Sequence, residues 1–68
     1  MGVIKLRLDI VMAERKVNGK QLAQAVGITE QNLSLLRTGK VKGVRFSTLD
    51  AICRELQCQP GDLIVYEE

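Results

Sequence analysis

Hydrophobic side chains recur at helical spacing in the middle of the chain, over residues 20–39. In the first half of this segment, Leu22, Ala23 and Val26 fall on one face of a helix. Gly27 then ends that helix, because glycine enters the left-handed backbone region without a steric penalty. The pattern therefore predicts a short helix that stops at a tight turn.

A second short helix is predicted over residues 30–37. The hydroxyl of Thr29 can cap its first turn, and Gly39 can end it. Leu33 and Leu36, three residues apart, give this helix its buried side. The other side is a polar face made of Glu30, Gln31, Asn32, Ser34 and Arg37. A helix pinned by its neighbour thus presents a row of hydrogen-bonding groups, with nothing catalytic among them.

The two ends of the chain have the pattern of short strands. Ile4, Leu6 and Leu8 alternate with charged residues, which is a period of two. Residues 63–66 form a compact β-prone run. Because an isolated strand is unstable in a small helical domain, we expect the two strands to pair with each other.

Helices are also predicted on both sides of the central pair. Residues 9–16 fit a helix with Val11 and Met12 pointing inward, and Asn18 is placed to cap the helix that begins near Lys20. These segments lead from the first strand into the central pair.

The chain after residue 39 is predicted to form a loop over residues 40–46, with Phe46 as a core anchor at its end. Ser47 then starts a helix, with an acid three residues later in a weak capping-box arrangement, and this helix runs to residue 56 or 57. One more helical turn can begin at Pro60. The predicted fold is mainly α, with five short helices and a strand at each end.

The composition is that of one small domain with an aliphatic core. The chain has 68 residues, of which 46% are hydrophobic and only 3% aromatic, which suits packed helices. Every apolar run is interrupted within a few residues, and no targeting segment is visible. We therefore expect residues 1–68 to be a single cytoplasmic domain without membrane association.

The two cysteines, Cys53 and Cys58, do not indicate a metal site. The chain has no histidine, and two thiols alone make a poor zinc site. Cys53 shares a helical stripe with Leu49, Ile52 and Leu56, so we interpret it as a small buried hydrophobic residue. A redox role for the pair is the alternative.

The charges are segregated along the chain, although the net charge is only +2. Residues 15–45 hold seven basic residues and one acid, whereas residues 46–68 hold one base and five acids. Such a basic lobe favours a polyanionic partner, with accidental clustering on a solvated surface as the alternative. An enzyme is disfavoured, because the sequence has no histidine, no phosphate-binding glycine loop and no nucleophile–base pair.

The segment over residues 20–39 resembles the helix-turn-helix of the Cro and phage-repressor (Xre-type) regulators. The resemblance rests on Leu22-Ala23, Gly27-Ile28-Thr29 and Gly39-Lys40. Similarity to small stand-alone members of the family extends from about Ile4 to Tyr66. It implies a lambda-repressor-like domain in which the small Ala23 lets the two motif helices cross closely.

Two positions depart from the pattern of that family. A glutamine that grips a phosphate is common at the start of the first motif helix, but this chain has Gly19 there, and Lys20 can take over that contact. Leu35 stands where a polar or basic side chain is usual. It can contact a thymine methyl group or pack against another part of the chain.

The resemblance implies sequence-specific binding to double-stranded DNA by a transcriptional regulator, with repression as the expected mode. The second motif helix would enter the major groove, where Gln31 and Asn32 can donate and accept at an adenine edge. Glu30 can accept from a cytosine amino group or stabilise the start of its own helix. The expected DNA-binding residues are Lys20, Thr29, Glu30, Gln31, Asn32, Ser34, Arg37, Lys40, Lys42 and Arg45.

We further expect a homodimer on a palindromic operator, because one recognition helix covers only a few base pairs. The terminal strands, residues 63–66 in particular, would supply apolar dimer surface away from the basic lobe. No cofactor, metal ion or small-molecule ligand is expected. The alternative function is that of an antitoxin or adaptor, in which the helix-turn-helix serves only as a scaffold for protein interaction.

The interpretation of the thiols is testable by substitution. Cys53→Ser should lower the free energy of unfolding by about 1–3 kcal/mol, because it buries a hydroxyl group. Cys58→Ser should leave folding and DNA affinity almost unchanged. Denaturant unfolding and DNA titration of both variants check this, and an oxidant that abolished DNA binding by the parent but not by Cys58→Ser would support the redox alternative instead.

Overall fold

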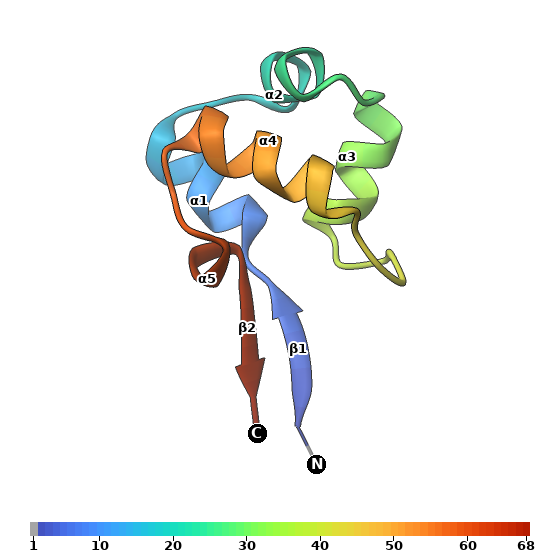
Figure 1. Ribbon diagram of the computed structural model, residues 1–68, viewed down its shortest axis with the longest axis vertical. Helices are drawn as coiled ribbons and strands as arrows, with labels where there is room; N and C mark the ends of the chain where they lie inside the picture. Colours follow the sequence, from blue (N-terminus) through green and yellow to red (C-terminus); the bar gives the residue numbers. More distant parts are fainter. Residues whose placement is uncertain (1) are drawn as a thin grey trace.

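The computed structural model describes residues 2–68, which form five short helices and a two-stranded ribbon (Figure 1). The elements follow in the order β1 (Val3–Leu6), α1 (Leu8–Arg15), α2 (Gly19–Val26), α3 (Glu30–Arg37), α4 (Phe46–Leu56), α5 (Pro60–Leu63) and β2 (Ile64–Glu67). The mainly α fold predicted from the sequence is confirmed. None of the helices within residues 2–68 is long and apolar enough to cross a membrane.

One aliphatic core holds the helices together. Its most deeply buried side chains are Met12, Leu22, Leu33 and Leu56, which come from α1, α2, α3 and α4 in turn. Burial of each such side chain stabilises the fold by roughly 1.5–3 kcal/mol. Among the described residues, no polar or charged side chain is buried, so the core contains no polar group that needs a partner.

A residue in the left-handed region follows each of the four longer helices. It is the first residue after α1, α2 and α4 (Lys16, Gly27 and Gln57), whereas after α3 it is Gly39, which comes after the right-handed Thr38. In each case the next residue donates its N–H to a carbonyl five positions earlier, as in the bond of 3.1 Å from Cys58 to Cys53. At the ends of α1, α2 and α4 the same carbonyl also accepts the N–H of the left-handed residue itself. Hydrogen bonds therefore close the C-terminal end of each of these helices.

The arginine at the end of α1 also stabilises the end of α4. The Nε–H of Arg15 donates to the Leu56 carbonyl at 2.9 Å. The positive guanidinium thus lies where the α4 dipole is negative. Arg15 belongs by sequence to the basic lobe, but its side chain links two helix ends.

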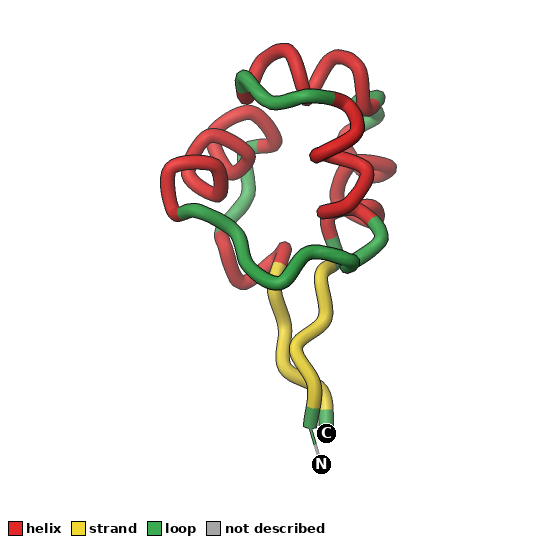
Figure 2. The backbone as a smooth tube through the Cα atoms, turned by 90° about the vertical axis from the view of Figure 1, so that its right-hand side faces the viewer, coloured by secondary structure: helices red, strands yellow, loops and turns green. Residues whose placement is uncertain are grey.

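The terminal strands pair with each other, as predicted. They run antiparallel, with Leu6 opposite Ile64 and Ile4 opposite Tyr66. The ribbon extends away from the helices, and the N- and C-termini lie together at its tip in both views (Figures 1 and 2). Leu8 was expected to continue the strand. It is instead the first residue of α1 and is buried in the core.

Two predictions for the start of α4 were wrong. Phe46 was expected to anchor the core, but its side chain is 87% exposed. Ser47 was expected to cap the helix, but α4 begins at Phe46, and its capping residue, Arg45, makes no side-chain cap bond. The inward stripe of α4 consists of Leu49, Ile52 and Leu56, and Phe46 at the first position lies off this stripe.

The left-handed residue at the end of α4 carries a testable steric cost. Gln57 has φ 54°, where a Cβ is unfavourable and glycine is not. The free energy of unfolding should therefore be about 1 kcal/mol higher for Gln57→Gly than for Gln57→Ala. Denaturant unfolding of the two variants measures this difference. The two variants lose the same bond from the Gln57 amide to the Arg54 carbonyl, so their difference isolates the Cβ. Equal free energies of unfolding would contradict a steric cost of the Cβ at this position.

Candidate nucleic-acid interface

The α2–α3 turn fixes the direction of α3. The carbonyl of Ala23 accepts the N–H groups of both Gly27, at 2.9 Å, and Ile28, at 3.0 Å. Ala23 itself is only 1% exposed, so a larger side chain there would push the neighbouring helix away. These bonds close α2 immediately before α3 begins.

The start of α3 is capped as the sequence predicted. The hydroxyl of Thr29 accepts the N–H of Asn32 at 3.0 Å. Leu33 and Leu36 then bury one side of the helix. The helix is thus held at its capped start and along its buried side, and its remaining side chains are exposed.

The exposed side chains of α3 point in three different directions. Successive residues are rotated by about 100°, so Gln31 lies almost opposite the buried side, with Ser34 and Leu35 next to it. Asn32 and Arg37 lie closer to the core, on opposite sides of the helix. The outermost face of α3 therefore consists of Gln31, Ser34 and Leu35.

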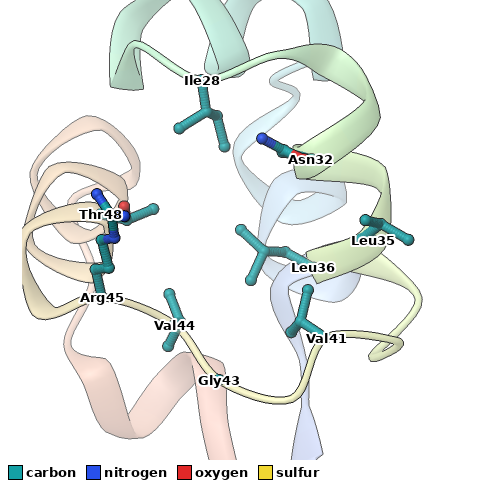
Figure 3. A pocket seen from close by; sticks show the side chains of 9 residues that line it. All are labelled: Ile28, Asn32, Leu35, Leu36, Val41, Gly43, Val44, Arg45 and Thr48. Carbon is teal, nitrogen blue, oxygen red and sulfur yellow. The ribbon is translucent and has the colours of Figure 1, made fainter.

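Asn32 faces a hollow of about 360 Å³ between α3 and α4 (Figure 3). Leu36 and Val44 contribute apolar walls, and Arg45 and Thr48 stand on the opposite side, at the start of α4. The hollow thus has an apolar lining with polar groups from two helices. The sequence grouped Asn32 with the outer face of α3, but it shares this hollow with Arg45.

Arg37 lies on the other flank of α3 and is paired with α1. Its guanidinium contacts a carboxylate oxygen of Asp9 at 2.8 Å. Gly19 leaves room for it, because a Cβ at that position would lie 3.1 Å from an Arg37 nitrogen. Asp9 was not among the predicted site residues. Sequence spacing could not indicate this contact, because the two residues are 28 positions apart and lie on different helices.

The other basic residues of the predicted site form no ion pair with the described residues. Within residues 2–68 the ion pairs are Arg37–Asp9 and Arg54–Asp50. The basic side chains of Lys20, Lys40, Lys42 and Arg45 are exposed and take no part in either pair. They come from α2, from the loop after α3 and from the start of α4. Positive charge is therefore available around α3.

Glu30 lies in the first turn of α3. An acid there interacts favourably with the positive end of the helix dipole.

The two thiols lie apart from α3: Cys53 is on α4, and Cys58 follows its end. Burial and the neighbouring Cys53 raise the pKa of Cys58 above its ordinary value. Within residues 2–68, no three His, Cys, Asp or Glu side chains come together as a metal site would require.

Known proteins resemble this chain in sequence and in fold. The uncharacterized HTH-type transcriptional regulator YozG of Bacillus subtilis strain 168 is 49% identical over 66 residues, which cover 97% of this chain and 77% of YozG. A crystal structure from Bacteroides fragilis, of a protein proposed to bind DNA, superposes with a TM-score of 0.83. That alignment covers 93% of this chain and all of the other at 24% identity, so it shows the fold alone.

The family is established by a match over most of the chain. The sequence model of the Cro/C1-type HTH DNA-binding domain matches residues 7–68, which include all five helices and β2. The resemblance seen in the α2–α3 segment is thereby confirmed. The chain belongs to the Cro/C1-type helix-turn-helix DNA-binding family.

Proposed function

We propose that the protein is a sequence-specific transcriptional regulator that inserts α3 into the major groove of double-stranded DNA. The main support is the outer face of α3, where Gln31 and Ser34 are exposed on a helix fixed by its cap and its buried side. Polar side chains on such a helix can reach base edges. In this proposal the protein is a cytoplasmic repressor, because repression requires only that a protein occupies the operator.

The free basic residues would hold the phosphate backbone. Lys40 and Lys42 follow α3 directly, and Arg45 stands across the hollow from Asn32. Lys20, near the start of α2, would contact a phosphate in place of the glutamine that is usual in the family. Such contacts fix the register of a protein on DNA without reading its sequence. Arg37 would reach a phosphate only by sharing its guanidinium with Asp9.

The remaining predicted residues would act near the start of α3. The Thr29 hydroxyl already caps the helix, and the free N–H groups of this end favour a phosphate. Glu30 would accept from a cytosine amino group. Asn32 would contact DNA from the edge of the hollow. The antitoxin or adaptor alternative is not favoured, because it leaves the polar face of α3 and the free cations without a role.

The proposal includes two-fold symmetry. One α3 would read only a few base pairs, so a homodimer on a palindromic operator would double the contacts and the specificity. Selection of bound duplexes from a random pool tests both parts at once. A recovered site with two inverted halves supports the dimer, and failure to bind any duplex at low salt would reject the proposed function.

The division between base-reading and phosphate-binding residues gives a second prediction. Gln31→Ala should lose roughly 1–3 kcal/mol on the selected site and relax the preference at particular base pairs. Lys40→Ala should weaken selected and scrambled duplexes equally and lower the salt slope by about 0.9 per lost phosphate contact. Titrations across a salt series separate the two effects. The assignment fails if Lys40→Ala changes the preferred bases and Gln31→Ala does not.

The exposed Leu35 gives a third prediction about base recognition. Its side chain is 39% exposed on the outer face of α3, so it would contact a thymine methyl group in the major groove. Replacing that thymine by deoxyuridine should weaken binding of the parent by about 0.8 kcal/mol, the value of one buried methyl-sized group. The same replacement should not affect Leu35→Ala, whereas the control Ser34→Ala should keep the full loss. An equal loss in Leu35→Ala would exclude the contact.

A further inference from the structure

Arg37 and Asp9 form the ion pair that joins α3 to α1. The Nε–H of Arg37 donates to Asp9 Oδ1 at 3.0 Å, and Nη2 lies 2.8 Å from the same oxygen. The side chains of Arg37 and Asp9 are 40% and 60% exposed. Exposed ion pairs contribute little to the free energy of folding, so the pair has a geometry that folding alone does not explain.

Asp9 uses only one edge of the guanidinium, the edge formed by Nε and Nη2. Within the chain that the structure describes, Nη1 of Arg37 makes no hydrogen bond and belongs to no ion pair. A guanidinium is planar and carries donors on more than one edge, so it can bind two anions at the same time. The edge formed by Nη1 and Nη2 therefore remains available for a second anion.

Gly19 shows where this available edge lies. A Cβ at position 19 would come within 3.1 Å of Nη1, which is closer than the optimal distance between two heavy atoms. Nη1 therefore lies directly against the first residue of α2. The next residue is the exposed Lys20, so the start of α2 carries a second positive charge near the guanidinium.

A DNA phosphate is the anion that fits this edge. Phosphate oxygens accept two parallel N–H bonds from a guanidinium, and α3, which carries Arg37, is the helix proposed to lie between the two phosphate backbones. We propose that Asp9 is a positioning residue for DNA binding, which holds Arg37 so that its Nη1 side binds a backbone phosphate beside the start of α2. This inference rests on the proposed function and gives α1 a part in it.

The ion pair favours this contact because it orders the arginine before DNA arrives. An unrestrained arginine loses rotamer entropy when it binds a ligand, and a side chain that is already held in the bound conformation avoids much of that cost. The Asp9 carboxylate takes a different edge of the guanidinium from the phosphate, so the two anions do not compete for the same pair of donors. Their repulsion is weakened by water and salt at this exposed site.

The competing hypothesis is that Asp9 only neutralises Arg37. An acid beside a phosphate-binding arginine would then weaken DNA binding, and its removal would strengthen binding. The two hypotheses predict opposite signs for the same substitution, Asp9→Asn. If Asp9 positions Arg37, this variant binds DNA more weakly than the parent, although its net charge is more positive by one.

Titration of the full chain with its selected duplex measures this sign. Asp9→Asn should raise the dissociation constant about tenfold, which corresponds to one charge-assisted hydrogen bond. The matched control is Glu14→Gln, which removes an exposed acid from the same helix. Glu14 belongs to neither ion pair within residues 2–68, so its removal should leave the constant unchanged or lower it. Thermal unfolding verifies that both variants are folded.

A double-substitution cycle tests whether Asp9 acts through Arg37. Arg37→Ala should weaken binding and lower the salt slope by about 0.9, because one phosphate contact is lost. In that background Asp9→Asn should no longer weaken binding. Gly19→Leu takes the place of Arg37→Ala in the cycle if the latter does not fold. Its side chain fills the space beside Nη1, and leucine favours a helix more than glycine does, so affinity should fall without a loss of stability.

Neutral methylphosphonates, placed one at a time in the selected duplex, give a readout that a loss of stability does not change. One phosphate should be identified by a replacement that weakens binding of the parent more than binding of Arg37→Ala. The penalty at that same phosphate should also be reduced in Asp9→Asn, whereas Glu14→Gln should keep the full penalty.

Two results would overturn the positioning role. One is that Asp9→Asn binds the selected duplex as tightly as Glu14→Gln or more tightly, and the other is that its loss of affinity persists in the Arg37→Ala background. Either result leaves the proposed function intact, because the parent still binds its selected duplex. Failure of the parent to bind any duplex at low salt would instead reject the function itself.

Discussion

The arrangement of this domain depends on the hydrogen bonds that close α2 immediately before α3. A single carbonyl, that of Ala23, accepts two N–H groups from the turn. It can do so because Gly27 adopts a positive φ of 86°, a conformation that is unfavourable for a residue with a Cβ. The turn sets the angle at which α3 leaves α2, and that angle decides which side chains of α3 are buried. The exposed row of Gln31, Ser34 and Leu35 follows from this local constraint.

The same kind of helix ending recurs around the core, but at two places it is made by residues that are less suited to it. Lys16 and Gln57 occupy the left-handed region with a Cβ. Packing offsets this cost, because each ending turns the chain back onto the shared aliphatic core. Arg15 adds a bond from α1 to the end of α4. Packing against the core thus offsets the backbone strain at these two helix ends.

The start of α4 is where the two surfaces of the molecule meet. On one side of it, Arg45 and Thr48 face Asn32 across the hollow beside α3. On the other side, Phe46 stands beside the groove that leads to α5. Neighbouring residues of one helix project in different directions, so this short segment lines two separate hollows of the surface.

Much of the fold could be predicted from the sequence, because it rests on local periodicity and on residues with special backbone preferences. The spacing of Leu22, Ala23, Leu33 and Leu36 gave the central helices, and the glycines gave their ends. The alternation at the N-terminal end and the β-prone run at the C-terminal end predicted the strands, and the lack of any other partner indicated that they pair. The cap at Thr29 followed from its hydroxyl and its position.

Other features were decided only by the tertiary structure, because they depend on which helices come together. The contact of Arg37 with Asp9 joins α3 to α1, and charge order along a chain does not indicate such a pair. Asn32 turns toward the hollow because α4 lies beside that flank of α3. Hydrophobicity alone predicted a buried Phe46, yet Leu49, Ile52 and Leu56 already fill the inward side of α4. Periodicity defines the faces of each helix by itself, whereas only the packed molecule determines what each face meets.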